Sequence, residues 1–489
     1  MSKLRLTWPM LVLLLVMGKV SADRPNVLLI VSDDLNRHLA AAGYDQVPTP
    51  ALSRLAGIGM RFNRAYCQYP VCGPSRASFL TGVYPESTGV LDNKTDVRDV
   101  RPELKSLPQL FKEAGYWTGG VGKVFHGKLD HGEVAWDEYH MFQNEWNPVL
   151  RPEQEAFEAE FGSIDLPKNQ KAWRAKLKEL RAAAGGQTPP GFGPTQMTDA
   201  QHKDGKNVRQ VSAWIENREG HPEPFCIASG LHKPPVPFWA PKKYFDLHPP
   251  GSILVDAVPV GDWGDIPARA LVHRYEAFGF QRGIEDMELR KRYMQAYHAC
   301  VSFVDAQIAE IWEAMDEQNL WNDTIVIFIS DHGYHLGEHF LWGKVTLFEE
   351  CARVPMLIHA PGITAAGSET RSLVELVDLL PTLCQLCNIE IPTYVQGRSL
   401  QPVLEDPATV VKRQAYTVVT RGASPLGRSV RTERWRFADW GDGQFELYDL
   451  KNDPHEFSNQ IKMSPGLQRE RMQRLLNQAT ARAVENQSN

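Results

Sequence analysis

The sequence predicts an α/β protein in which helices cover both faces of a large sheet, with a smaller α+β subdomain near the C-terminus. From residue 25 onward, short apolar runs alternate with segments of helical periodicity, as in a sheet between two layers of helices. After about residue 365 the pattern changes to short segments of strand-like alternation, which indicates a separate antiparallel sheet. With 489 residues, 43% of them hydrophobic, the chain can bury a large core.

The first 22 residues are expected to be a secretory signal peptide. Lys3 and Arg5 precede an apolar run that ends at Met17, and Ala22 occupies the small-residue position of a cleavage site. The apolar run is shorter than the ~20 residues that a membrane span needs. We therefore expect an exported protein without stable membrane insertion, in the periplasm, the extracellular space or the lysosome according to the host.

Five apolar runs predict the buried strands of the sheet. They are rich in β-branched or aromatic residues, or end in glycine, and they cover residues 26–32, 116–122, 224–230, 324–330 and 354–360. Apolar residues at helical spacing over 290–318 predict one long packed helix.

The predicted domain boundaries follow changes in composition. Residues 23–365 are expected to form the main domain and residues 366–489 the C-terminal subdomain, which begins with a helix at 373–387. Between 141 and 222 the chain is in turn charged, Ala-rich and Gly/Pro-rich. This segment predicts a surface insertion with one exposed helix.

Charge and cysteine content exclude some classes of protein. The net charge is -6 and there is no long basic run, so no nucleic-acid partner is expected. Seven cysteines leave at least one outside any internal disulfide. Cys384 and Cys387 are one helical turn apart with no second ligand pair nearby, which favours core cysteines over a zinc site.

Ionisable side chains follow four of the five predicted strands. Any one of them has an ordinary explanation, since an aspartate after a strand is usually a turn or cap residue. Sites in open α/β sheets form outside the carboxyl ends of the strands, however, and four such groups coincide there: Asp33-Asp34, Lys123 with His126, His232-Lys233, and Asp331-His332. Three aspartates in one pocket need a cation, and hard carboxylate oxygens favour calcium, with magnesium as the alternative, over zinc.

The stretch YPVCGPSRASFLTG, residues 69 to 82, predicts a helix with a cysteine at its amino end. Pro74 suits the first turn, and Thr81-Gly82 ends the helix. Arg76 lies one turn beyond Cys72 on the same face, so that the helix end and the guanidinium together favour a bound anion. A buried core cysteine and an activated thiolate are the alternatives, but a soft thiol is a poor neighbour for calcium.

C-x-P-S-R followed by A-S-F-L-T-G resembles the signature of the type I sulfatases, in which the cysteine is converted to formylglycine after synthesis. Within that family the chain is most similar to the iduronate-2-sulfatase group, on GKVFHG, GLHKPPVPFWAPKKY, SDHGYHLGEHFLWGK and ELVDLLPTL. The resemblance runs from about residue 25 to the end. It implies an alkaline-phosphatase-like fold, with a large mixed sheet sandwiched by helices and an antiparallel sheet in the C-terminal subdomain.

The resemblance also implies a role for each matching residue. Arg76 and Lys123 would stabilise the aldehyde hydrate and the sulfate oxygens, and His126 would take a proton when sulfate is released. His232 with Lys344 would bind sulfate and protonate the leaving alcohol. Calcium would be held by Asp33, Asp34, formylglycine at Cys72, Asp331 and His332.

The implied reaction is hydrolysis of a sulfate ester on carbohydrate, with a 2-O-sulfated uronic acid at a glycosaminoglycan chain end as the expected substrate. One hydrate hydroxyl attacks sulfur, the sugar alcohol leaves, and loss of a proton from the other hydroxyl expels sulfate. Tyr334 and Trp342 are aromatic candidates for sugar contact, with a packing role as the alternative for each. The expected partners are the sulfated saccharide and the enzyme that generates formylglycine.

Two other functions remain open at this point. A phosphomonoester or phosphonate-ester hydrolase would share the strand-end arrangement, although the arginine after CGPS favours the sulfatase. A non-catalytic protein that binds sulfated glycans through an unmodified Cys72 would not need Lys123, His126, His232 and Lys344 together.

Overall fold

The computed structural model describes residues 24–126, 132–143, 151–164, 166–183, 191–218, 221–272, 278–422, 426–463 and 466–484. The predicted signal peptide lies outside these residues. Among the helices that the structure describes, none is both long and apolar enough to cross a membrane.

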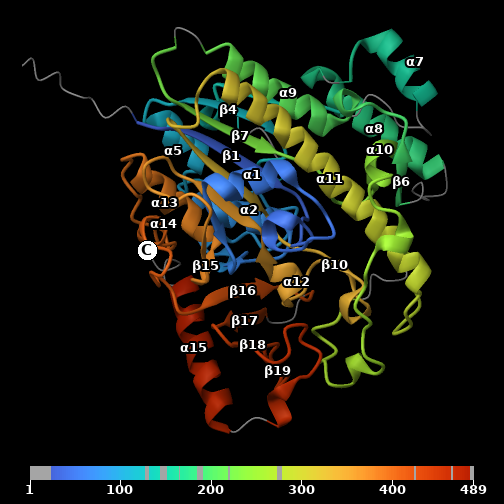
Figure 1. The fold of residues 1–489 in the computed structure, drawn as a ribbon, viewed down its shortest axis with the longest axis vertical. Helices are drawn as coiled ribbons and strands as arrows, with labels where there is room; N and C mark the ends of the chain where they lie inside the picture. Colours follow the sequence, from blue (N-terminus) through green and yellow to red (C-terminus); the bar gives the residue numbers. More distant parts are fainter. Residues whose placement is uncertain are drawn as a thin grey trace, which may run out of the picture.

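An eight-stranded mixed sheet forms the centre of the molecule (Figure 1). Its strands run in the order β14 (Ser368–Thr370), β2 (Met60–Phe62), β13 (Met356–His359), β9 (Thr324–Ser330), β1 (Asn26–Ser32), β7 (Phe225–Gly230), β4 (Trp117–Gly122) and β5 (Glu138–His140). The five strands from β9 to β5 are parallel, and β13 is antiparallel to β9 and β2. The structure therefore confirms all five predicted strands, although the fifth begins at Met356.

Helices cover both faces of this sheet because its central strands are apolar on both sides. In β1, Leu28 and Ile30 face one core, which α1 (Pro50–Ile58), α9 (Lys203–Glu216) and α11 (Met287–Glu317) complete. Val27, Leu29 and Val31 face the other core, together with α2 (Cys72–Thr81), α5 (Leu107–Glu113) and α13 (Leu379–Leu386). The predicted long helix is α11, and the side chain of Asp286 caps it by accepting a hydrogen bond from Leu289 N.

The segment from 141 to 222 differs from the prediction of a surface insertion with one exposed helix. It contains α7 (Arg151–Phe161), α8 (Pro167–Ala183), β6 (Phe192–Thr195) and α9. The helix α9 buries Val208, Val211, Trp214 and Ile215 in the first core, and β6 pairs with β8 (Phe238–Pro241). The last part of the segment is therefore integral to the main body, because α9 carries an apolar face.

The C-terminal sheet is antiparallel, as predicted, and has the order β16 (Ala415–Val419), β17 (Gly427–Arg431), β18 (Trp435–Asp439) and β19 (Phe445–Asp449). With α15 (Gly466–Val484), at the lower end of the molecule in Figure 1, it packs around a third core, to which Tyr69, Tyr84 and Phe348 of the main body also contribute. The predicted boundary at 365 differs from the structure, since β14 pairs with β2 in the main sheet and α13 packs in the second core.

Two small sheets link these parts. One has the order β12 (Arg353–Val354), β3 (Ala65–Tyr66) and β15 (Val374–Glu375), and the other is the hairpin of β10 (His335–Leu336) and β11 (Trp342–Gly343). At the junction with the C-terminal sheet, Lys412 lies between two fully buried carboxylates, 2.5 Å from Glu375 Oε2 and 2.5 Å from Asp378 Oδ1.

Glycines at the ends of β4 and β7 bring two chain segments into close contact. A Cβ atom at Gly230 would lie 1.9 Å from the carbonyl carbon of Lys123, and Gly122 has a φ of +67°. Only glycine fits such an approach. As a result, the residues that follow β4 and β7 leave the sheet side by side.

Candidate active site

Two central strands deliver acidic residues at the same level of the sheet. β1 and β9 are in register up to Ser32 and Ser330, so Asp33-Asp34 and Asp331-His332 follow at one edge. Asp34 adopts a left-handed backbone conformation with φ of +56°, and its N–H donates to Asp331 Oδ1 at 3.1 Å. The two strand ends are thereby joined.

Four buried side chains form a group that could hold a metal ion. Asp33, Cys72, Asp331 and His332 each offer one ligand atom, and these atoms all lie within 4.8 Å of one another. Asp34 adjoins this group, because its Oδ1 lies 3.2 Å from His332 Nε2. The carboxylates predicted as metal ligands from two distant strands are therefore brought together.

The helix α2 presents Cys72 to this group. Cys72 is its first residue, after Val71 in extended conformation, and every residue of the helix is buried. Ser75 Oγ donates to the carbonyl oxygen of Asp331 at 2.5 Å, which fixes the helix start against the end of β9. The sulfur of Cys72 lies 3.4 Å from His332 Nε2 and 3.8 Å from Asp34 Oδ1.

Arg76 lies beneath the acidic group and is fully buried. Its Nε donates to Asp331 Oδ2 at 2.8 Å and its Nη2 to Asp33 Oδ1 at 3.1 Å, while Nη1 donates to the carbonyl oxygens of Lys123 and Val124. In this arrangement the guanidinium ties the segment after β4 to both aspartates. Burial alone would raise the pKa of Asp33, but the charges of Lys123 and Arg76 hold it well below its usual range.

Two lysines contact the acidic group. Lys123 Nζ donates to both carboxylate oxygens of Asp33, at 2.8 and 2.7 Å. Lys344 Nζ lies 2.5 Å from Asp34 Oδ1 and 3.0 Å from the sulfur of Cys72. Burial and Asp33 oppose ionisation of the thiol, but these two cations outweigh them and lower the pKa of Cys72 to about 7.

Two histidines face the same cavity in their neutral form. Burial, followed by the charge of Lys123, lowers the pKa of His126 to about 4, and its Nδ1 has no hydrogen-bond partner within the described ranges. Burial and the charge of Lys203 likewise lower the pKa of His232 to about 4. A negatively charged ester beside His232 would favour its protonated form.

Asp204 fixes the orientation of His232. Its carboxylate accepts hydrogen bonds from the backbone N–H of His232 at 2.8 and 3.0 Å and from that of Lys233 at 3.0 Å. The ring Nδ1 of His232 also lies 3.0 Å from Asp204 Oδ1. The carboxylate therefore selects the tautomer with a proton on Nδ1 and turns Nε2 toward the cavity.

Part of this group lines a cavity of about 690 Å³, namely Asp33, Asp34, Cys72, Lys123, His126, His232 and Lys344. Tyr334 belongs to its lining, beside Pro235, Val236 and Phe278. Trp342 does not line it: the side chain is 2% exposed and stacks on Phe280 in the first core. These surroundings agree with a packing role for Trp342, which the sequence had left open as the alternative to sugar contact.

Sequence reasoning missed three polar residues of the site. Asp204 and Lys203 begin α9, and burial lowers the pKa of Lys203 to about 8. Asn93 lines the cavity and accepts a hydrogen bond from Gly73 N at 2.8 Å. One signal in the sequence could have identified Asp204 and Lys203. The amphipathic pattern over 203–216 indicates a packed helix, which would have excluded these two residues from the predicted surface insertion.

Chemically, the arrangement suits a tetrahedral oxyanion beside a cation. Buried carboxylates provide hard ligands, and two lysines provide fixed positive charge. The two histidines are neutral in the free protein and could transfer protons once a bound anion raises their pKa. Residue 72 lies at the centre of these groups, where a nucleophile would stand.

Comparisons with known proteins agree with this geometry. The family model described as Sulfatase matches residues 25–389, and the model described as N-sulphoglucosamine sulphohydrolase, C-terminal, matches residues 337–483. A sulfatase of Formosa agariphila is 30% identical over 449 residues, which cover 90% of this chain and 83% of that protein. The iduronate 2-sulfatase of Homo sapiens is 31% identical over 410 residues, 76% of this chain and 70% of that protein.

Among solved structures, a phosphonate monoester hydrolase of Agrobacterium radiobacter has the same fold. The TM-score is 0.74 at 21% sequence identity, over 94% of this chain and 96% of that chain. The sheet, its two helical layers and the C-terminal antiparallel sheet are therefore an architecture that hydrolases of more than one ester share.

Proposed function

The chain belongs to the sulfatase family and is a sulfuric ester hydrolase, and we propose that it is an exported, calcium-dependent enzyme that uses formylglycine at residue 72 to release sulfate from carbohydrate. The observation that carries the proposal is the buried group of Asp33, Cys72, Asp331 and His332 at the amino end of α2. The cations of Lys123 and Lys344, which contact Asp33 and Asp34, would bind the sulfate group.

The residues present fit a calcium ion. Asp33, Asp34 and Asp331 offer hard carboxylate oxygens, which calcium prefers, and His332 and residue 72 complete the proposed ligand set. The thiol of Cys72 is the exception, because sulfur is a soft ligand. Calcium would supply positive charge that neutralises the sulfate oxygens.

Conversion of Cys72 to formylglycine removes this mismatch, since the hydrated aldehyde offers hydroxyl oxygens in place of sulfur. One hydroxyl would serve as the nucleophile toward sulfur, and the other would lose its proton when sulfate departs. The family carries this modification generally, and the C-x-P-S-R motif at 72–76 supports it here.

The surrounding side chains would bind and orient the ester. Lys123 and Lys344 would neutralise the sulfate oxygens, with Arg76 keeping Asp33 and Asp331 in place beneath them. His232, once the bound anion has raised its pKa, would donate a proton from Nε2 to the leaving alcohol. His126, neutral in the free protein, would accept the proton released with sulfate.

The proposed substrate is a 2-O-sulfated uronic acid at the end of a glycosaminoglycan chain. This part rests on the relative named iduronate 2-sulfatase and on a cavity of about 690 Å³. Tyr334, Pro235, Val236 and Phe278 form an apolar side of the cavity, against which the C–H groups of a sugar ring can pack.

Phosphonate-ester hydrolysis is the second candidate, because a phosphonate monoester hydrolase shares the fold. A phosphonate ester would bind to the same two lysines and to the same metal-binding group of side chains. A purely glycan-binding role is the third candidate. It would require an unmodified Cys72 and gives no reason for two half-buried histidines in the cavity.

The first test is the mass of the Cys72 peptide from protein expressed together with a formylglycine-generating enzyme. Replacement of the thiol by an aldehyde, with a loss of about 18 Da, is expected. Release of sulfate from a 2-O-sulfated uronic acid disaccharide would then be compared with hydrolysis of an aryl sulfate, an aryl phosphate and an aryl phosphonate. Faster turnover of the phosphorus esters would favour the second candidate, and fully modified but inactive protein would favour the third.

Export follows from the proposed signal peptide at residues 1–22. Amino-terminal sequencing of the mature protein from its native host would test it, with a start at Asp23 as the expected result. A mature chain that retained Met1 would contradict it.

A further inference from the structure

A groove with an excess of positive charge runs beside the main sheet, where β2 and β14 meet the C-terminal sheet. The groove has a volume of about 860 Å³, and eight basic side chains line it against two carboxylates, Glu369 and Glu433. We call it the basic groove. It shares no lining residue with the catalytic cavity. Because the whole chain has a net charge of -6, this concentration of cations is a local feature.

On the side of the main sheet, the groove contains Arg61, Arg64 and Arg371. Arg61 forms an ion pair with Glu369, and Arg64 lies 3.7 Å from Glu433, whose side chain is 85% exposed. Arg371 is exposed, and within the described chain its side chain makes no hydrogen bond or ion pair. The exposed ion pairs of Arg61 and Arg64 add little to stability. These two arginines, like Arg371, therefore remain available to a ligand.

On the side of the C-terminal sheet, the groove contains Arg431, Arg434 and Lys451. Arg431 Nε donates to Glu349 Oε1 at 2.9 Å, and Arg434 forms a two-fold ion pair with Asp449. Lys451 is exposed, and its side chain has no hydrogen bond or ion pair to any residue that the structure describes. Even after Glu349 and Asp449 are counted with the two lining carboxylates, basic groups outnumber acidic ones.

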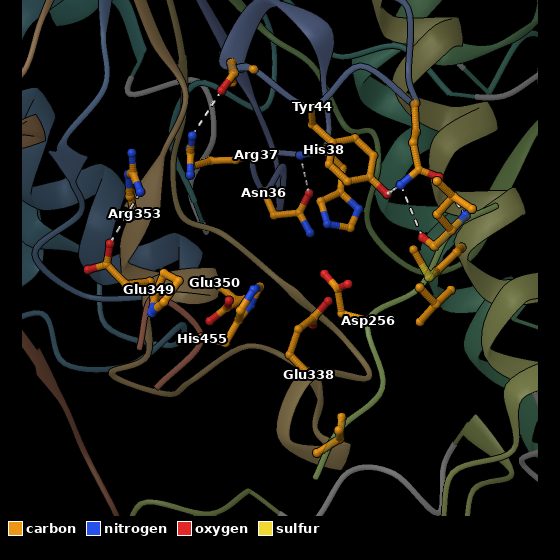
Figure 2. A pocket seen from close by; sticks show the side chains of 18 of the residues that line it. Asn36, Arg37, His38, Tyr44, Asp256, Glu338, Glu349, Glu350, Arg353 and His455 are labelled. Atoms are coloured by element: carbon orange, nitrogen blue, oxygen red, sulfur yellow. Dashed lines mark hydrogen bonds and ion pairs between the residues drawn. The ribbon is translucent and has the colours of Figure 1, made fainter. Parts of the chain in front are cut away.

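Arg37 and Arg353 lie where the basic groove meets a second cavity of about 480 Å³, which Figure 2 shows. Arg37 Nη2 donates to the carbonyl oxygen of Ala42 at 3.0 Å. Arg353 Nε donates to Asn63 O at 2.7 Å, and its nearest carboxylate is the Glu349 that Arg431 also uses. Burial and the charge of Arg353 lower the pKa of Arg37 to about 10. A bound anion would relieve this repulsion between like charges.

We propose that the basic groove binds an anionic stretch of a sulfated polysaccharide, away from the sulfate ester that is hydrolysed. The inference rests on the proposed function in taking a sulfated saccharide as the ligand. Seven of the eight cations are arginines, and their planar guanidinium groups match sulfate and carboxylate in pairs. Among the described residues that line the groove, none is an aromatic side chain on which nucleic-acid bases could stack. The groove would hold a long chain near the enzyme and raise the rate on polysaccharide, without altering the chemistry on a small ester.

The test compares two charge-reversal variants of equal charge. Arg371→Glu/Lys451→Glu changes the groove, whereas Arg471→Glu/Lys462→Glu changes two exposed side chains that do not line it. Both are made in a Cys72→Ala background, and binding of a size-defined heparin oligosaccharide is measured by calorimetry at several salt concentrations. The groove variant should bind about tenfold more weakly and with a shallower salt dependence, and the control should bind like its parent.

A parallel measurement separates this inference from the proposed function. With Cys72 intact and modified, the groove variant should keep its kcat/KM on an aryl sulfate and lose about tenfold on sulfated polysaccharide. Equal heparin affinity in both variants would overturn the inference even if the enzyme releases sulfate. Absence of sulfate release from every ester would overturn the proposed function and leave the heparin measurement valid. Equally tight binding of a DNA duplex in the groove would overturn the assignment to a saccharide.

Discussion

Replacement of Asp204 by asparagine tests whether the orientation of His232 matters for catalysis. Asp204 is 1% exposed, and its two oxygens accept hydrogen bonds from the N–H groups of His232 and Lys233 and contact the imidazole Nδ1. In the variant, one oxygen becomes an NH₂ group that faces these donors. Asp204 is a positioning residue, since it touches neither the metal group nor the substrate cavity.

The expected size of the effect follows from one lost hydrogen bond to a charged acceptor. Such a bond contributes about 1.5–3 kcal/mol, and each 1.36 kcal/mol of transition-state energy is tenfold in rate, so kcat should fall about 10- to 100-fold. KM should change less than about threefold, because Lys123 and Lys344, the proposed ligands of the sulfate group, are unchanged in the variant. Steady-state kinetics on an aryl sulfate with fully modified protein would measure both constants.

Asp199→Asn serves as the matched control. Asp199 Oδ2 accepts hydrogen bonds from Tyr244 at 2.6 Å, Lys243 at 2.9 Å and Gln307 at 3.1 Å, outside the cavity. This variant should lose thermal stability to a similar degree while keeping its kcat. The reasoning would be refuted if Asp204→Asn retained native kcat, or if Asp199→Asn lost as much activity. Partial recovery of kcat in Asp204→Glu would support the role of the carboxylate.

Four further predictions concern the site and the stability of the fold. Cys72→Ser should stop at a serine that carries sulfate, or before it, because serine lacks the second hydroxyl; intact mass would detect the added SO₃ group. Removal of divalent ions with EDTA should lower the melting temperature, because it would leave the buried carboxylates unneutralised. Calcium should restore the melting temperature more effectively than magnesium, and equal effects of both ions would contradict calcium selectivity. Burial, followed by the charge of Lys233, lowers the pKa of His202 to about 4, so protonation of His202 alone should lower the free energy of unfolding by up to about 3 kcal/mol between pH 6.5 and 4. His202→Gln should lack this contribution, so that its stability falls less than that of the parent over the same range. Lys412→Met should cost about 3–5 kcal/mol in urea unfolding because it strands two buried carboxylates, and a loss below about 1 kcal/mol would contradict this account.

The sequence predicted those parts of the fold whose signals are local. The strands at 26–32 and 324–330 agree with β1 and β9 residue for residue, because a run of apolar β-formers bounded by polar residues is readable on its own. The start of α2 at Cys72 was equally readable, from Pro74 and the glycine that ends the helix. Because the two strands are parallel, the ionisable residues that follow them lie at the same edge of the sheet.

The rest depends on contacts between distant residues. Asp204 contacts His232, which lies 28 positions later in the chain. The charged, Gly-rich sequence before Asp204 instead favoured the prediction of a surface insertion. The boundary at 365 differed because β14 joins β2 more than 300 residues earlier, which no local pattern reveals. Trp342 illustrates a third limit: an aromatic residue next to a catalytic motif suits both a sugar platform and a core, and its burial distinguishes them only in the folded chain.

The burial of α2 constrains when residue 72 can be altered. In the folded protein Cys72 is 2% exposed and every residue around it in the helix is covered, so a modifying enzyme could not reach it there. Roughly 260 residues separate Cys72 from Asp331, which helps to cover it. At about 5–20 residues per second, synthesis of that stretch lasts about 10–50 s. The conversion to formylglycine would therefore compete with folding, and the proportion of active molecules would be fixed once the chain has folded over Cys72.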